Sequence, residues 1–556
     1  MQVVYDVGSW RITDDGQVYR RGKLRFANGD LYDGEWMDGK RHGQGKFTYQ
    51  NGSTYTGELV ANLYNGCGVL VVADAKHPFT GKWVKGSTYD GQFQRGKKHG
   101  KGLVVFGEGG SYDGMFHDNA FHGDGLRCYA NGDRYEGEWR HGSWWGLGHL
   151  RRVDGESYRG ECKRGLFHTG ALGVGRRTFR RGHGSYEGGY RDGLQHGKGL
   201  RVFADGSSYE GDWVDNVMHG NGVWSTAAFT YIGEFQHDRP HGHGLFTFTN
   251  GDVYEGSVRE GHFYGRGKYT YKDGSWYDGE YMATTTTMTS NTAKQQTVKE
   301  VPLPNGLKHG QGRRRWVNGN EYDGEWKDDA MHGQGRLTVT YTTNGCALRT
   351  EYDGAFANGR PSGHGTLKAW NPDGICMEFP SASGNWYRGR GTCTYTGDFA
   401  NGLFHGQGTL TTCDGRRYEG SWQRGKRHGH GRSDLIPLVE QGDEARMHIK
   451  GSSALYRIAR YDGMHEQDKR QGFGKAYFSN GESIEGTFVN GQADGIATYV
   501  YTSGKRRRGS WKLGQRVAWL SNDDDAKWAG VDKAVDLSMA AFSRRKSSCD
   551  LERTTT

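Results

Sequence analysis

Residues 32–52 read YDGEWMDGKRHGQGKFTYQNG, and this stretch contains the pattern that decides the fold. It begins with a tyrosine, a glycine and an aromatic residue at alternate positions, Tyr32, Gly34 and Trp36. A basic pair, a His-Gly-x-Gly block and an Asn-Gly pair follow in that order. Side chains at alternate positions lie on one face of a β-strand. The spacing therefore predicts strands, since a helix repeats every 3.6 residues.

The same pattern returns along the chain, mostly at intervals of 22 or 23 residues, so it is an internal repeat. Asn-Gly or Asp-Gly between two alternating runs is typical of a hairpin turn in which both central residues have positive φ. We therefore expect two antiparallel strands per unit, with successive units adding strands to one sheet. The clearest copies of the signature are Tyr32-Gly34-Trp36, Tyr112-Gly114-Phe116, Tyr135-Gly137-Trp139, Tyr209-Gly211-Trp213, Tyr322-Gly324-Trp326 and Tyr418-Gly420-Trp422.

Glycine next to the aromatic residues has a physical reason. A tyrosine or tryptophan ring needs a flat surface, and a glycine on the same strand face lets a ring lie on bare backbone. The residues between these positions, such as Asp33 and Glu35, are charged and point to the other face of the strand. Cross-strand pairing of opposite charges is the expected role of that face.

Composition excludes several classes of protein. Among 556 residues there are 94 glycines but only 8 prolines, and 13% of the residues are aromatic, which argues against collagen and against complete disorder. The net charge of +9 allows acidic partners without indicating nucleic acid. The 8 cysteines form no CxxC pair, so neither a zinc site nor a disulfide framework is expected. The aliphatic run 69–73 is far shorter than the ~20 residues that span a bilayer.

Taken together, the tyrosine signature, the basic turn, His-Gly-x-Gly and Asn-Gly resemble the MORN repeat. About 17 copies cover most of residues 19–514. The resemblance implies an all-β fold, an elongated single-sheet antiparallel solenoid of stacked β-hairpins. With two strands per unit at ~4.8 Å spacing, 17 units in one stack would extend on the order of 160 Å.

Irregular spacing between repeats predicts the domain organisation. We expect an N-terminal cap and degenerate repeat over 1–31, a repeat array over 32–282 and a flexible insertion over 283–306. A second array is expected over 307–432 with an insertion at 366–394. An irregular insertion at 433–460, degenerate terminal repeats at 461–514 and a tail at 515–556 complete the prediction. Within the tail, 528–546 has the spacing of a short amphipathic helix with Val531, Val535, Met539 and Phe542 on one face.

Motifs of enzymes are not convincing in this chain. Three GxxxxGK matches, such as the one ending at Lys40, lack the Ser or Thr and the helix that a phosphate-binding loop needs. The repeated histidines precede glycines in predicted turns, which favours a structural role over metal binding. We therefore expect no catalytic residue, no metal, no cofactor and no enzymatic activity.

Two functions remain compatible with the sequence. The first is a non-catalytic scaffold that binds proteins, because an open repeat array presents an extended surface. The resemblance to MORN proteins implies cytoplasmic sites at the cytoskeleton, a cilium, flagellum or basal body, or the membrane periphery, with cytoskeletal partners or self-association.

The second is binding of phosphoinositides or other acidic phospholipids, which the resemblance also implies. Clusters of basic residues can attract anionic headgroups. Ordinary solubilising charge is the alternative for each cluster. Ser547 follows a basic run and is a candidate phosphorylation site. The candidate lipid-binding residues are Arg176, Arg177, Arg180, Arg181, Arg313, Arg314, Arg315, Lys505, Arg506, Arg507 and Arg508.

Overall fold

The computed structural model describes residues 6–12, 14–76, 79–170, 173–283, 305–343, 346–371, 377–378, 386–387, 391–434, 446–447 and 456–520. Over these residues the regular structure is β-strand apart from one 3-10 turn, η1 at Arg180–Gly182. The all-β prediction is confirmed. Contacts divide the chain into two units. Unit 1 comprises Met1–Tyr264 and Thr285–Asn305, and unit 2 comprises Gly265–Thr284 and Gly306–Thr556.

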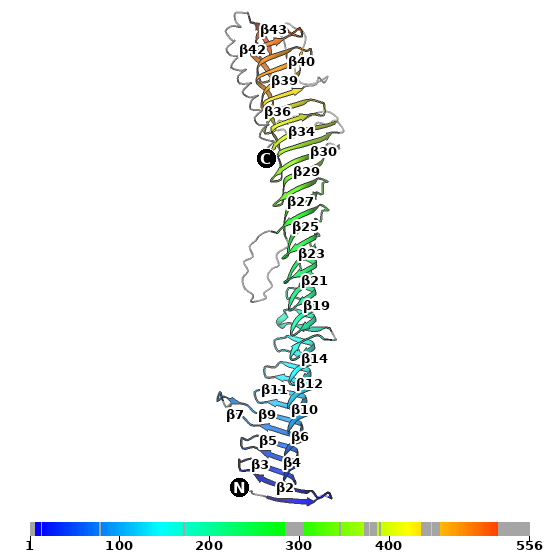
Figure 1. The fold of residues 1–556 in the computed structure, drawn as a ribbon, viewed down its shortest axis with the longest axis vertical. Coiled ribbons are helices and arrows are strands. Elements are labelled where there is room, and N and C mark those ends of the chain that lie inside the picture. Colours follow the sequence, from blue (N-terminus) through cyan, green and yellow to red (C-terminus); the bar gives the residue numbers. More distant parts are fainter. Residues whose placement is uncertain are drawn as a thin grey trace, which may run out of the picture. The chain divides into compact units, whose positions relative to one another are not determined.

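The strands of unit 1 follow the chain in order (Figure 1). They are β1 (Asp6–Ile12), β2 (Val18–Arg25), β3 (Leu31–Met37), β4 (Lys40–Thr48), β5 (Thr54–Val60), β6 (Leu63–Val72), β7 (Ala75–Lys76), β8 (Trp83–Val84), β9 (Ser87–Gln94), β10 (Lys97–Phe106), β11 (Gly110–His117), β12 (Ala120–Tyr129), β13 (Arg134–Arg140), β14 (Ser143–Arg151), β15 (Ser157–Lys163), β16 (Leu166–Phe167), β17 (Gly175–Thr178), β18 (Ser185–Arg191), β19 (Leu194–Val202), β20 (Ser208–Val214), β21 (Val217–Ser225), β22 (Phe229–Gln236), β23 (Arg239–Phe248) and β24 (Val253–Arg259).

Strand β25 (His262–Thr270) crosses the boundary between the units. The remaining strands belong to unit 2 and also follow the chain in order. They are β26 (Trp276–Met282), β27 (Leu307–Arg315), β28 (Glu321–Lys327), β29 (Ala330–Thr343), β30 (Cys346–Ala357), β31 (Arg360–Asn371), β32 (Met377–Glu378), β33 (Trp386–Tyr387), β34 (Gly391–Ala400), β35 (Leu403–Thr411), β36 (Arg417–Gln423), β37 (Lys426–Asp434), β38 (Arg446–Met447), β39 (Tyr456–Glu466), β40 (Lys469–Phe478), β41 (Ser483–Val489), β42 (Gln492–Val500), β43 (Arg506–Lys512) and β44 (Gln515–Trp519).

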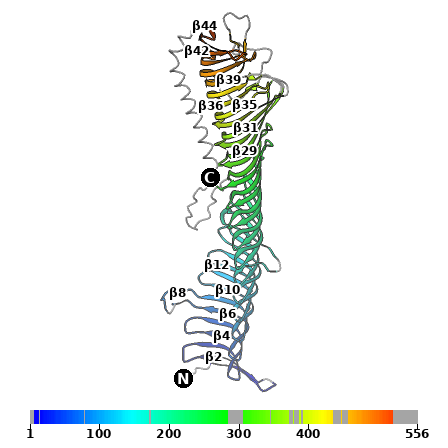
Figure 2. The same cartoon turned by 45° about the horizontal axis from the view of Figure 1, so that its top comes forward.

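Pairing within each unit is antiparallel and runs from one strand to the next. The glycines of the signature fix the register: Gly34 of β3 faces Gly45 of β4, and Gly45 in turn faces Gly57 of β5. The same glycine pairing recurs in unit 2, where Gly324 faces Gly335. In Figures 1 and 2 the strands of each unit form one layer. The prediction of an antiparallel sheet of stacked hairpins is confirmed.

The tyrosines form the core on one face of this layer, which we call the tyrosine face. Tyr32 is 0% exposed, although the sheet is a single layer, because its ring lies over the two facing glycines. A Cβ placed on Gly34 would come within 2.5 Å of both the Tyr32 hydroxyl and the Gly45 Cα. The Tyr32 hydroxyl donates a hydrogen bond to the Glu35 carbonyl at 2.9 Å. Each tyrosine therefore covers its own hairpin.

Rings from successive strands continue this core. The Tyr112 ring stacks on Phe121 of the next strand, with centroids 3.8 Å apart, and meets Trp139 of the following repeat edge-on at 5.4 Å. The Trp139 indole nitrogen donates to the Gly125 carbonyl at 3.2 Å. Both ring geometries are favourable for aromatic pairs. Neighbouring repeats are thereby joined through side chains as well as through the strands.

The two connections of each repeat differ from the prediction. At Asn51-Gly52 only the glycine has positive φ, +86°, and the loop is closed by hydrogen bonds from Tyr49 N to Ser53 O and from Gly52 N to Tyr49 O. The pair of positive φ values lies instead at the other connection, at Asp38 (+47°) and Gly39 (+75°). The tight two-residue turn therefore lies at the connection whose residues vary more between repeats. The sequence did not predict it there.

The prediction that the His-Gly block lies in a turn is wrong. It lies inside the second strand rather than in a turn, at an irregularity in the β3–β4 register between Gly34 and Trp36. Gly43 has a φ of +59° at this point. The residue between the glycine and the aromatic position caps the irregularity in other repeats: a Glu325 carboxylate oxygen accepts the Gln334 amide at 3.0 Å. The acidic residue thus has a structural role in addition to its charge.

The predicted domain boundaries stay predictions. Strand pairing continues from Thr366↔Thr396 to Asn371↔Gly391, which are the two ends of the predicted insertion at 366–394. Most of 283–306, 433–460 and the tail, including 528–546 and Ser547, lies outside the described residues.

Candidate functional site

The basic clusters were the candidate binding residues, and the strand geometry separates their members. Arg176 and Arg177 are neighbours on β17, so their side chains lie on opposite faces of the sheet. The Arg177 guanidinium donates to Glu156 at 2.8 Å, and the Glu156 side chain is 8% exposed. Arg176 pairs with Glu187 at 2.8 Å on the other face. Both arginines are therefore neutralised within the protein.

The second cluster, on β27, is divided in the same way. Arg313 and Arg315 both reach Glu321, at 2.9 and 3.5 Å. Arg314 lies on the tyrosine face, where its guanidinium is 5.1 Å from the Tyr271 ring centroid and 5.2 Å from the Trp316 centroid. Arginines held between rings in this way contribute to packing as well as charge. No common face presents all three cations.

Arg180 and Arg181 belong to η1, and Arg181 has a φ of +49°. Neither of them takes part in an ion pair among the described residues. They lie in a short turn between β17 and β18, so they do not share a strand with Arg176 and Arg177.

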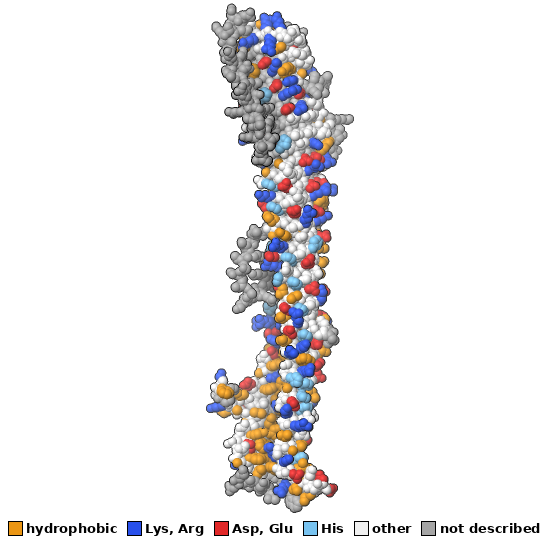
Figure 3. Space-filling model, in the orientation of Figure 1, with side chains coloured by type: hydrophobic (Ala, Val, Ile, Leu, Met, Phe, Trp, Pro, Cys, Tyr) orange, Lys and Arg blue, Asp and Glu red, His pale blue; other side chains and the backbone are white. Residues whose placement is uncertain are grey.

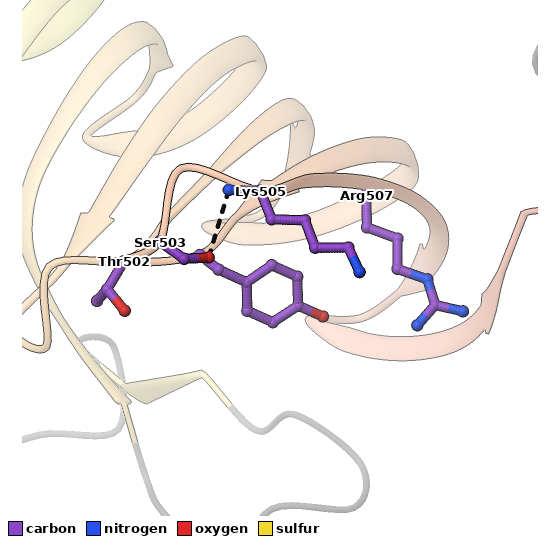
Figure 4. Close-up of a pocket in the computed structure, with 5 residues that line it drawn as sticks. Thr502, Ser503, Lys505 and Arg507 are labelled. Carbon is purple, nitrogen blue, oxygen red and sulfur yellow. Dashed lines mark hydrogen bonds between the residues drawn. The ribbon is translucent and has the colours of Figure 1, made fainter.

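The third cluster contains a surface depression of about 330 Å³, drawn in Figure 4. Tyr501, Thr502 and Ser503 of the turn before β43 line it together with Lys505 and Arg507. Lys505 and Arg507 are at alternate positions and project to the same side in Figure 4. The Arg507 guanidinium is also 4.6 Å from the Trp519 ring centroid. Arg506 and Arg508 point to the other side of the strand.

Histidines gather along the edge where the tight turns lie. The imidazole rings of His99, His117, His122 and His141 follow one another, with centroids 4.9, 5.3 and 5.6 Å apart. Burial, with repulsion from the neighbouring histidines, lowers the pKa of His122. Within the described ranges, no group of three or more His, Cys, Asp or Glu side chains is arranged to hold a metal ion.

The face opposite the tyrosines differs between the units, and sequence reasoning missed this. In unit 2, acids on this face pair with cations of the neighbouring strand, as Asp353 does with Arg336 at 2.7 Å and Glu485 with Lys475 at 3.4 Å. In unit 1, exposed aliphatic residues occupy several of these positions. On the side of the molecule drawn in Figure 3, hydrophobic side chains gather over the N-terminal strands, and charges of both signs are interspersed over the others.

We name five exposed aliphatic residues on this face, which come from β6, β10, β12 and β14, the aliphatic strip. The strip comprises Val71, Leu103, Val105, Leu126 and Leu147, whose side chains are 38–52% exposed. Counting the alternate positions of each strand, rather than the repeat signature alone, would have revealed it.

Comparison with protein families now identifies the class of this chain. The model of the MORN repeat matches sixteen segments: 32–54, 55–74, 89–111, 112–134, 135–157, 186–208, 209–227, 231–253, 254–276, 305–321, 322–338, 352–368, 395–415, 418–434, 461–483 and 485–506. Together the segments make up more than half of the chain, and this protein belongs to the MORN-repeat family. No catalytic domain is identified by the same comparison.

Other comparisons add little. A search of curated proteins gives no match. Among solved structures, a streptogramin B lyase matches 49% of this chain and 90% of its own length, with 13% sequence identity and a TM-score of 0.10. A score of this size supports no conclusion about fold or function. Among the described residues no helix is long and apolar enough to span a bilayer.

Proposed function

We propose that this MORN-repeat protein is a non-catalytic scaffold that binds other proteins along its sheet. The observation that supports the proposal is that one face of the sheet is buried and the other is open. The tyrosine face buries its rings against glycines and against each other, so it needs no second layer. The opposite face is therefore left open on strand after strand, and such repeated surfaces are typical of interaction scaffolds.

The proposal also includes a location in the cell. Likeness to other MORN proteins supports a cytoplasmic place at the cytoskeleton, a cilium, flagellum or basal body, or the membrane periphery. Its partners in this proposal are cytoskeletal proteins or further copies of the chain.

Proximity labelling with the full-length chain in its native cell tests the scaffold role. We expect a reproducible set of labelled proteins that requires the exposed face. The matched variants are Leu103→Ser with Leu126→Ser on that face and Asn221→Ala, another exposed position of unit 1. Loss of labelled proteins in the first variant but not in the second supports the proposal. Labelling no richer than that of an unrelated cytoplasmic control protein contradicts it.

A second candidate function is binding of an anionic phospholipid headgroup, and the depression of Figure 4 favours it. Two cations, Lys505 and Arg507, line the same concave surface, whereas Arg177, Arg313 and Arg315 are already paired with acids. Each basic residue near an acidic membrane contributes about 1 kcal/mol. This proposal places the lipid function at the end of unit 2.

Co-sedimentation with vesicles containing a phosphoinositide, at physiological salt, tests this candidate. Lys505→Glu with Arg507→Glu should abolish binding. The control is Arg506→Glu with Arg508→Glu, which makes the same change of charge on the other side of the strand. Equal loss in both variants would indicate a general effect of charge and would contradict a site in the depression.

A further inference from the structure

The aliphatic strip of unit 1 is a regular alignment of residues on alternate strands, not a scatter of single exposed residues. It draws on every second strand, β6, β10, β12 and β14, and crosses these strands obliquely. Val71 and Val105 both face Thr88, and Leu103 and Leu126 both face Asp113. Isolated exposed aliphatic residues are ordinary, but aligned ones mark interaction surfaces.

Acidic side chains accompany the strip and form no ion pair among the described residues. Asp90 and Asp113 lie on the strands between the aliphatic ones, and Glu136 faces Leu126. All three are exposed, and none takes part in an ion pair among the described residues. In unit 2 the corresponding Asp353 pairs with Arg336 at 2.7 Å. The strip therefore has the chemistry to receive a segment that is apolar on one side and basic at its end.

The chain itself contains such a segment. Residues 528–546 carry Val531, Val535, Met539 and Phe542 at helical spacing, and their sequence ends in Arg544, Arg545 and Lys546. This part of the chain lies outside the described residues. Its charge is complementary to that of the acids beside the strip, and such complementarity selects a partner and its orientation.

The dimensions of the segment and of the strip also agree. From β6 to β14 there are six strand spacings, or about 29 Å at ~4.8 Å each. Nineteen residues in a helix extend about 28 Å. Two helical turns rise about 11 Å, and successive aliphatic strands are about 10 Å apart. The apolar positions from Val531 to Phe542 extend about 17 Å in a helix, which is enough to contact two successive aliphatic strands such as β10 and β12.

We propose that the segment 528–546 of a second copy of this chain docks as a helix on the aliphatic strip of unit 1. Its apolar side packs against Leu103, Val105 and Leu126, and its basic end approaches Asp90 and Asp113. This inference rests on the scaffold function proposed above, since it names a partner for the open face. Docking of an amphipathic helix through its apolar side is a recurrent mode of recognition.

The first test measures binding of a fluorescently labelled synthetic peptide of residues 528–546 by anisotropy. The receptor is the full-length chain with Val535→Ser and Phe542→Ser, whose own segment has lost the apolar residues needed to occupy the strip. Adding Leu103→Ser and Leu126→Ser should weaken binding at least tenfold. Ile232→Ser, a matched change at an exposed aliphatic residue outside the strip, should leave it unchanged. No binding, or equal binding to all receptors, overturns the inference.

A charge exchange tests the orientation. Asp90→Lys with Asp113→Lys in the receptor should weaken binding, and a peptide with Arg544→Glu and Arg545→Glu should restore it. Failure of this rescue overturns the proposed placement of the basic end. Circular dichroism of each receptor excludes unfolding as the cause.

Sedimentation velocity of the unmodified full-length chain tests whether the docked segment belongs to a second copy. Association that increases with concentration should be lost with Leu103→Ser and Leu126→Ser, and equally with Val535→Ser and Phe542→Ser. A chain that stays monomeric while the peptide binds would show that the segment docks on its own molecule, and would overturn the second copy as occupant. If the peptide fails to bind while proximity labelling still finds strip-dependent partners, this inference fails and the scaffold function stands.

Discussion

At the scale of single residues, the tyrosine of each repeat and its two glycines act as one packing unit. Burial of the phenol raises the pKa of Tyr32 to about 12, because the anion would lose its contact with water. The ring occupies the space that a side chain on Gly34 or Gly45 would need. The glycines cost strand stability, and the buried rings offset that cost.

Gly211→Val tests this packing. A Cβ on Gly211 would lie 2.5 Å from the Tyr209 hydroxyl and 2.6 Å from the Asn221 carbonyl oxygen, so the ring must move. We expect a loss of roughly 1–3 kcal/mol in the free energy of unfolding, measured by urea denaturation; Gly34→Val should behave alike. Glu210→Val is the control, because it adds an apolar side chain on the exposed face next to the same glycine. Similar stability of the glycine variant and the control would contradict the packing described here.

His465 shows what happens when the aromatic position of a repeat is changed. It occupies the place of tryptophan in the signature, is 3% exposed, and meets the Tyr418 and Tyr461 rings edge-on at 5.2 and 5.1 Å. Burial, reinforced by the nearby Arg427, lowers the pKa of His465 to about 3. The imidazole is therefore neutral in the folded protein at neutral pH.

Stability of this repeat should fall in mild acid. An unfolded histidine has a pKa near 6.5, so between about pH 6.5 and 3 the unfolded state binds a proton that the folded state does not. From pH 7 to pH 5 this costs about 2 kcal/mol. His465→Phe should remove that part of the pH dependence, measured by hydrogen exchange of β39 and β40 at the two pH values. An unchanged difference between the two pH values would mean that His465 is not the responsible group.

At the scale of elements, the tight turn within each repeat also contacts the preceding repeat. Asn216 has a φ of +71°, its amide donates to the Gln195 carbonyl, and its side-chain oxygen accepts the Gln195 amide at 2.9 Å. Asn119 makes the same contact with Lys98, and Asp329 with Lys308. The second turn residue thus satisfies a backbone group of the preceding repeat.

Substitutions of Asn216 separate the contribution of the side-chain hydrogen bond from that of the positive φ. Asn216→Gly keeps the positive φ and loses the hydrogen bond, and we expect about 1 kcal/mol of destabilisation. Asn216→Ala also incurs the cost of a left-handed conformation and should lose about 2 kcal/mol. Thermal unfolding in parallel with Asn221→Ala, an exposed control on β21, checks the order. A glycine variant less stable than the alanine variant would contradict this account.

Much of the fold follows from the period of two. The strand face is predicted by the alternation of Tyr32, Gly34 and Trp36. The repeat length predicts hairpins, because every repeat has the same sequence pattern. The tight turn was not predictable because its residues vary, from Asp38-Gly39 to Ala61-Asn62 and Gln467-Asp468, and their positive φ is imposed by the strands they join. Asn-Gly is the more familiar signal, yet its loop here is longer.

The candidate site was predicted less well, for a related reason. A run of arginines in the sequence suggests one basic patch, but a strand sends neighbours to opposite faces. Arg177 therefore reaches Glu156, which lies 21 residues earlier, and no local pattern indicates that pairing. Lys505 and Arg507 lie together because they are two residues apart. Arg313 and Arg315 also share a face, but both pair with Glu321.

At the scale of the whole molecule, contacts extend mainly to neighbouring repeats. In such proteins stability is nearly a sum of repeat stabilities and the interfaces between neighbours. A defect in one repeat should therefore loosen its surroundings and leave distant repeats intact.

Hydrogen exchange of the Gly211→Val protein tests this locality. We expect faster exchange in β18–β23 of unit 1 and unchanged exchange in β41–β43 of unit 2, because local unfolding is limited to the substituted repeat and its neighbours. Gly486→Val, with its substituted residue on β41, is the reciprocal control and should show the opposite pattern. Uniform acceleration over both units would show that the chain unfolds as one cooperative body.

The order of the strands also bears on how the protein is made. Because most strands pair with the strand that precedes them in the chain, a hairpin can close soon after it leaves the ribosome, on the edge formed by earlier hairpins. Contacts close in sequence are formed quickly, and synthesis is slow by comparison. The newest edge is then the end to which each later hairpin is added, so a pause in translation would leave a shorter stack that is already folded.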